Sequence, residues 1–140
     1  MEFKKLLVPV DGSKHSMAAA QCALDLAKGT GAEIILMHCH RPFPVMLGEP
    51  FLQKAIDDRL EKSKKLLVPY EELFNKHGVQ FTDRLMEGPP RDIISEVAKI
   101  EKCDMIVMGS RGRTDLEGLF LGSATHKVLH TAPCPVLVVR

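Results

Sequence analysis

The sequence predicts one α/β domain built on a doubly wound, five-stranded parallel sheet with helices on both faces. Its 140 residues match the usual length of a single domain. Four strand-length runs are mostly apolar on both faces, which is typical of strands covered on both sides. Helical patterns separate these runs, and strict alternation of strand and helix favours right-handed crossovers with parallel pairing.

Five segments are expected to form the strands. A segment at 79–85 alternates apolar and polar residues, which indicates a half-exposed or edge strand. The other four are apolar, and they lie at 5–10, 34–38, 105–108 and 135–139.

Four helices are expected between these strands. Ser13 can cap the first, and Gly29 and Gly31 follow its last turn. Pro69 lies inside the second and should kink or interrupt it. The helix starts fall near Ser13, Pro50, Pro90 and Ser123.

Composition argues against several classes of partner. The chain carries 19 basic and 18 acidic residues, so it lacks the concentrated positive charge of most nucleic-acid and membrane-surface binders. No window approaches the roughly 18 apolar residues of a membrane span, and no cleavage-like segment follows the N-terminus. The four cysteines form no Cys-x-x-Cys pair, which suits reduced thiols. We therefore expect a cytoplasmic protein with neither nucleic acid nor membrane as a partner.

The segment 109–125 carries the densest functional signal. Ligands of doubly wound sheets bind beyond the carboxyl ends of the strands, and this glycine-rich segment follows a predicted strand there. The free amides of the next helix, with the hydroxyls of Ser123 and Thr125, can bind an anion such as phosphate. Arg111 and Arg113 add positive charge. The alternative is that the glycines only turn a surface loop and Ser123 only caps the helix.

Asp11 is the second candidate, because it follows the first strand. Its carboxylate can accept a hydrogen bond from a ribose hydroxyl or help to hold Mg²⁺ through water. It could equally cap the first helix, and both roles can hold together. The sequence contains neither Gly-x-x-x-x-Gly-Lys-Ser/Thr nor Gly-x-Gly-x-x-Gly, so neither a P-loop NTPase nor a typical dinucleotide oxidoreductase is supported.

Two pairs of histidines invite a metal-binding interpretation. His38 and His40 share one side of a strand while Cys39 points to the other, which disfavours a three-ligand cluster. His126 and His130 lie four residues apart, and a solvated helix face explains them better. We expect no metal site from histidine.

One spacing is specific to a known family. Gly109, two residues, Gly112, nine residues, and then Gly122-Ser123 form a pattern that resembles the nucleotide-binding members of the universal stress protein family. The resemblance covers nearly the whole chain, from the Leu-Val-Pro-Val-Asp-Gly-Ser stretch that ends at Ser13 to the close at 134–139. It implies a Rossmann-like, homodimeric domain with strand order 3-2-1-4-5 that binds ATP, with Mg²⁺ accompanying the nucleotide.

The resemblance also implies a set of ATP-binding residues. Cys39 would lie beside the base, where a branched apolar residue such as valine is common in the family. This substitution keeps a small apolar wall and adds a thiol that could be oxidised. Adenine and ribose would meet Pro9, Val10 and Asp11, with Ser13 following. Ribose and phosphates would meet Gly109, Arg111, Gly112, Gly122, Ser123, Ala124 and Thr125.

If the last strand lies at a sheet edge, as the resemblance implies, it would leave an apolar edge unpaired in a monomer. Pairing with a second copy would cover it, so we expect a twofold dimer. A charge at Leu137 would then give monomers. The edge residues are Val136, Leu137, Val138 and Val139.

We expect a regulatory, stress-response module that binds ATP and hydrolyses it slowly or not at all, because no residue stands out as a general base. One alternative is an ATPase or nucleotide-transferring enzyme that uses Asp11 with Mg²⁺, and Arg111 or Arg113. Another is a nucleotide-free, dimeric interaction module.

Overall fold

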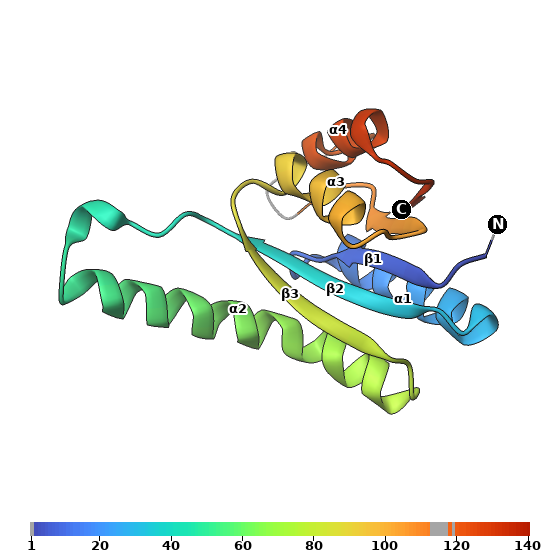
Figure 1. The fold of residues 1–140 in the computed structure, drawn as a ribbon, viewed down its shortest axis with the longest axis horizontal. Coiled ribbons are helices and arrows are strands. Elements are labelled where there is room, and N and C mark those ends of the chain that lie inside the picture. The colour runs from blue at the N-terminus through green and yellow to red at the C-terminus, as the bar shows by residue number, and fades with distance from the viewer. Residues whose placement is uncertain (1, 113–117, 119) are drawn as a thin grey trace.

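A computed structural model describes residues 2–112, 118 and 120–140. Strands and helices alternate along the chain, as the sequence predicts (Figure 1). A short 3-10 helix, η1 (Val45–Leu47), precedes the second helix. The strands are β1 (Lys5–Pro9), β2 (Glu33–His40), β3 (Phe81–Glu87), β4 (Met105–Gly109) and β5 (Val136–Val139). The helices are α1 (Lys14–Thr30), α2 (Phe51–Lys76), α3 (Pro90–Ile100) and α4 (Ser123–Thr131).

The five strands form one sheet in the order β3-β2-β1-β4-β5, and every pair is parallel. This confirms both the fold class and the strand order. The chain leaves β1 toward β2 on one side, whereas β4 joins β1 on the other side. The strand order therefore reverses between β1 and β4, and the loops that follow these two strands diverge there.

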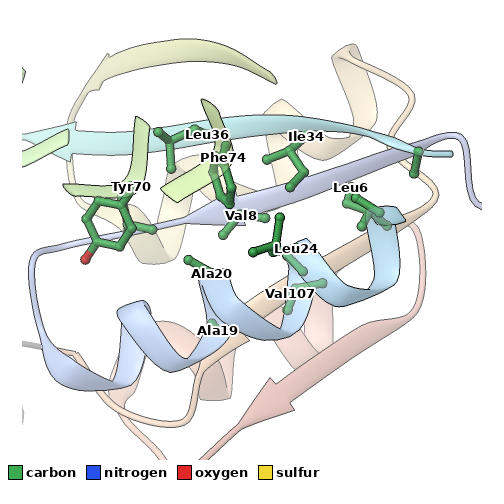
Figure 2. Packing of buried hydrophobic residues seen from close by; sticks show 14 of the residues in the cluster. Leu6, Val8, Ala19, Ala20, Leu24, Ile34, Leu36, Tyr70, Phe74 and Val107 are labelled. Atoms are coloured by element: carbon green, nitrogen blue, oxygen red, sulfur yellow. The ribbon is translucent and has the colours of Figure 1, made fainter. Parts of the chain in front are cut away.

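Helices cover both faces of the sheet, with α1 and α2 on one face and α3 and α4 on the other (Figure 1). Successive residues of β1 serve opposite faces, because side chains alternate along a strand. Leu6 and Val8 pack with α1 and α2 residues such as Leu24 and Phe74 (Figure 2). Leu7 packs on the other face among residues of α3 and α4.

Two details differ from the sequence prediction. Helix α2 runs through Pro69, so the expected interruption is wrong. Pro69 and Lys65 both lie on the exposed side of the helix, where water can bind the carbonyl that loses its backbone donor. The strand expected at 79–85 is shifted to Phe81–Glu87, although it does lie at an edge of the sheet.

Only the second half of α2 is anchored in the core. Its deeply buried side chains are Leu67, Tyr70 and Phe74, each at most 2% exposed. The first half extends past the sheet beside η1, where Met46 is 95% exposed (Figure 1). Within the described part of the chain, no helix is long and apolar enough to span a membrane.

Candidate functional site

The loop between β1 and α1 has a fixed backbone. Val10 donates its N–H to the Met37 carbonyl at 2.7 Å, and His38 Nδ1 lies 2.8 Å from the Val10 carbonyl oxygen. That carbonyl accepts, so Nδ1 carries the proton. Val10 is also 4% exposed and packs in the core. Val10 therefore positions the loop, and its own polar groups are already engaged.

Asp11 and Ser13 form the turn into α1. Ser13 donates its N–H to Asp11 Oδ1 at 3.0 Å, and its hydroxyl accepts the N–H of Ser16 at 3.2 Å. Ser13 is therefore the N-cap of α1, which confirms the sequence prediction. Asp11 is half-buried and supplies a carboxylate at the carboxyl end of β1. Doubly wound sheets bind their ligands in the crevice beyond the carboxyl ends of the strands.

Residues that follow β4 are tied directly to the start of α4. Ser110 accepts the N–H of Gly122 at 2.7 Å. Thr125, 2% exposed, donates its hydroxyl to the Gly109 carbonyl at 2.8 Å. In this structure the hydroxyl proton predicted to bind phosphate is donated to the protein's own backbone, and it ties the start of α4 to the end of β4. The residue at the surface of this turn is Ser123, which is exposed.

The start of α4 has the features of an anion site. Its N-cap is Gly122, which has no side chain to occupy the first helical amides. A cavity of about 520 Å³ opens beside it, and its lining is rich in basic side chains. That lining consists of Arg91, Leu121, Gly122, Ser123, His126, Lys127 and His130.

A second cavity of about 410 Å³ lies on the β4 side of the same loop, and its lining includes Ser110 and Gly118. Its basic side chains are His15, Arg111 and Arg140, the last stacked over Phe120 at 5.1 Å from the ring centroid. Both cavities thus collect positive charge around the predicted phosphate end. Three predicted residues come soon after β4 in the chain. Arg111 and Gly112 are half-buried, and Arg113 falls outside the described residues.

The predicted base end is separate from these two cavities, neither of which has Asp11 or Cys39 in its lining. Cys39 lies two positions beyond Met37, the partner of Pro9 in the sheet. It packs against the cluster on the α3 side, and burial raises the pKa of its thiol to about 12. The thiol is therefore protonated at neutral pH and is a poor nucleophile.

Among the described residues, no group of three or more His, Cys, Asp and Glu side chains could hold a metal ion. His38 and His40 instead bond backbone carbonyls, of Val10 and Arg41 respectively. His126 and His130 are exposed, with ring centroids 5.0 Å apart. The predicted magnesium ligand, Asp11, lies at the β1 end and lines neither cavity, so a Mg²⁺ ion at the phosphate end would be held largely by phosphate oxygens and water.

Sequence reasoning missed Tyr70 and Ser16. The Tyr70 side chain reaches the β1–α1 loop from α2, and its hydroxyl contacts both Gly12 and Ser16. A buried tyrosine needs a hydrogen-bond partner for its hydroxyl. A tyrosine at a core position of α2 therefore already indicated that such a partner exists. The identity of that partner depends on packing between segments more than 50 residues apart.

Comparison with known proteins identifies the family to which the chain belongs. The sequence pattern of the universal stress protein family matches residues 2–140, which is nearly the whole chain. The chain belongs to this family. A universal stress protein from Thermus aquaticus, described by its place in the 3′ region of QAH/OAS sulfhydrylase, is 42% identical over 139 residues, covering 99% of each chain.

Solved structures of universal stress proteins show the same fold. The structure of MJ0577, a universal stress protein of Methanocaldococcus jannaschii, is 29% identical, covers 99% of this chain and 96% of its own, and gives a TM-score of 0.88. A universal stress protein from Archaeoglobus fulgidus was solved in complex with dAMP. It is 20% identical, covers 100% of both chains and gives a TM-score of 0.74. Its likeness establishes the shared fold.

Proposed function

We propose that this universal stress protein binds an adenine nucleotide, ATP with Mg²⁺, across the carboxyl ends of β1 and β4. The observation that carries the proposal is the start of α4, where the N-cap Gly122 and the next residue, Ser123, line a cavity rich in basic side chains. The dAMP held by the Archaeoglobus fulgidus relative supports adenine as the base.

The residues at the two ends of the site suit different parts of the nucleotide. At the β1 end, Asp11 offers an acceptor for ribose hydroxyls, and Cys39 offers a small, uncharged wall for a base. At the β4 end, Gly112 and Gly122 let the backbone approach phosphate, and Gly109 lets α1 pack closely on β4. Arg111 and Lys127 border the two cavities there and add positive charge.

We infer a regulatory role with slow or no hydrolysis. Among the described residues, the linings of the two cavities at the phosphate end include no carboxylate side chain that could activate water beside a terminal phosphate. Asp11 is the carboxylate at the opposite end and is already engaged by the Ser13 N–H. In such a protein the bound nucleotide changes which partner is held.

Calorimetric titration with Mg-ATP tests the proposal on ligand-stripped protein. Gly122→Asp places a carboxylate at the phosphate end and should abolish the binding heat. Gly29→Asp adds the same charge within α1, where a new side chain meets nothing within 4 Å, and should bind as wild type does. Absence of binding by wild-type protein would contradict the proposal. Rapid turnover that is lost in Asp11→Ala would favour the ATPase alternative.

We further propose a homodimer through β5. This strand lies at the edge of the sheet next to β4. The carbonyl groups of Pro135, just before β5, and of Val139, its last residue, face β4. They accept the N–H groups of Ile106 and Ser110. Since backbone groups alternate in direction along a strand, those of Val136 and Val138 point to the open edge. A second copy can pair there, which would cover an apolar edge strand.

The expected monomerising change at Leu137 needs correction. Leu137 and Val139 pack against the core cluster on the α1 side, and Val136 packs against the other cluster. A charge at Leu137 would therefore disturb folding as well as pairing. Val138 is the better position for a test.

We propose a cytoplasmic location. All four cysteines are free, including the buried Cys103. Free thiols are typical of proteins kept in a reducing compartment.

A further inference from the structure

The side chain of Tyr70 joins α2 to the loop that carries Asp11. It is 1% exposed, and its hydroxyl points out of the apolar cluster toward the start of α1 (Figure 2). Gly12 donates its N–H to the Tyr70 oxygen at 3.2 Å, and Ser16 Oγ lies 2.6 Å from that oxygen. A residue of α2 thus binds the backbone directly after Asp11.

Counting protons gives the direction of these hydrogen bonds. Ser16 Oγ donates its proton to the Ser13 carbonyl at 3.1 Å. The proton between Ser16 and Tyr70 must then belong to Tyr70, which donates it to Ser16 Oγ. Ser16 Oγ also accepts the Asp11 N–H at 3.3 Å. Burial raises the pKa of Tyr70, which keeps this proton in place at neutral pH.

The loop has little freedom to relax away from this support. Gly12 adopts a left-handed conformation, with φ of 84°. A β-carbon on Gly12 would lie 3.3 Å from Leu66 Cδ1, one helical turn before Tyr70. One face of α2 therefore contacts the loop at two points. The backbone N–H groups of Asp11 and Gly12 are hydrogen-bonded to Ser16 Oγ and to the Tyr70 hydroxyl, respectively. The Asp11 side chain is therefore held on a fixed stretch of backbone.

We propose that Tyr70 is a positioning residue for the nucleotide site, holding the Asp11–Gly12 backbone in the conformation that receives the ribose and thereby coupling nucleotide binding to the packing of α2. The inference rests on the proposed nucleotide-binding function. Loss of the hydroxyl leaves the Gly12 N–H and Ser16 Oγ without this partner, so the loop populates other conformations. Apparent affinity falls in proportion to the population that remains competent.

Tyr70→Phe isolates the hydroxyl, because the ring stays in the core. We expect its Kd for Mg-ATP, measured by calorimetry, to be about fivefold to fiftyfold weaker, the range that corresponds to one or two hydrogen bonds. Phe74→Leu is the matched control. It removes volume from the same buried face of α2, where Phe74 is fully buried against Phe81, and leaves the hydroxyl network intact. It should lower the thermal midpoint and keep the wild-type Kd.

A spectroscopic measurement separates positioning from a merely structural role. Tyr70 is the one tyrosine of the chain, which has no tryptophan, so 3-fluorotyrosine labelling gives a single ¹⁹F signal. Titration with Mg-ATP should shift this signal with the midpoint that calorimetry gives. If Tyr70→Phe does not fold, Ser16→Ala removes the other end of the bond and should weaken binding likewise.

The outcomes distinguish this proposal from the one on which it rests. Wild-type binding with an unchanged Kd in Tyr70→Phe, or with an unmoved ¹⁹F signal, overturns the role of Tyr70 alone. Equal weakening in Phe74→Leu also overturns it, because the effect would then follow from loss of packing. Wild-type protein that shows neither binding heat nor a ¹⁹F shift overturns both proposals.

Discussion

A β-carbon on Gly109 would lie 2.8 Å from both the carbonyl carbon and the β-carbon of His15. Gly109 ends β4, and His15 lies in the first turn of α1, so the helix crosses the strand end at backbone contact. The obstacle is backbone and cannot swing aside. The first glycine of the family pattern is therefore required by the packing of α1 on β4, whatever the site binds.

Gly109→Ala should lower the free energy of unfolding by about 1–3 kcal/mol, because α1 must shift to admit the methyl group. Gly29→Ala is the control. Gly29 lies inside α1 with nothing near its missing side chain, so alanine there should raise stability by about 0.5–1 kcal/mol. Denaturant unfolding measures both. Equal stability of Gly109→Ala and wild type would show that the contact is looser than the structure has it.

The carboxyl group of Glu71 on α2 meets that of Asp83 on β3. This contact raises the pKa of Glu71 to about 7, chiefly because it hydrogen-bonds Asp83 and secondly because it is partly desolvated. Asp83 Oδ1 is buried without a hydrogen-bond donor among the described residues. A proton on Glu71 gives the pair of carboxyl groups a hydrogen bond, so the contact between α2 and the edge strand is strongest in the protonated form.

Stability should therefore fall as the pH rises from about 4.5 to about 7. Over this range the folded chain keeps a proton that the unfolded chain has lost, since the ordinary pKa is 4.5. Glu71→Gln supplies an N–H donor at every pH. It should remove this part of the slope and exceed wild-type stability above pH 7 by roughly 1 kcal/mol, allowing for solvent screening.

Unfolding curves at several pH values measure this slope. Glu61→Gln serves as the control, because Glu61 is on the same helix and its ion pair with Lys65 is exposed. It should keep the wild-type slope. An identical slope in Glu71→Gln would show that Glu71 is not the titrating group.

Val138→Pro should convert the proposed dimer to monomers. Proline removes an N–H that points to the open edge of β5, whereas the bonds to β4 run through neighbouring positions. Val138→Thr keeps both the N–H and the shape of the side chain and should stay dimeric. Light scattering gives the mass of each variant, with thermal unfolding to verify folding. A dimeric Val138→Pro protein would place the interface elsewhere.

Thr125→Val should lower the free energy of unfolding by about 1–2 kcal/mol, because the buried Gly109 carbonyl loses its donor at 2.8 Å. Thr131→Val is the comparison on the same helix. The Thr131 hydroxyl donates to the Lys127 carbonyl and lies 2.6 Å from Ser95 Oγ, but both bonds are exposed and water can replace them. Its change should stay within about 0.5 kcal/mol. Thermal unfolding measures both variants. Equal losses of stability in Thr125→Val and Thr131→Val would contradict the role given to the buried bond.

Much of the fold was predictable from local pattern. Apolar runs such as 34–38 can be stable only when covered on both faces, and the glycines, prolines and Ser13 mark where helices begin and end. Pro69 misled the prediction because the cost of a proline depends on whether water reaches the carbonyl it leaves unpaired. That depends on which side of α2 faces solvent, and Pro69 lies opposite the buried face formed by Leu67, Tyr70 and Phe74.

At the candidate site, too, some features follow from the sequence and others depend on the tertiary structure. The sequence by itself determined the class of fold, the helix cap at Ser13 and the glycine spacing of the family, because each depends on residues close together in the chain. Only the tertiary structure decided that the hydroxyl of Thr125 turns inward and that Gly109 is required by His15. It alone showed that Tyr70 supports the Asp11 loop, because these contacts join α1, α2 and β4 across the core. Whether a polar group is free for a ligand depends on which neighbours have already bound it, and folding supplies those neighbours from distant segments.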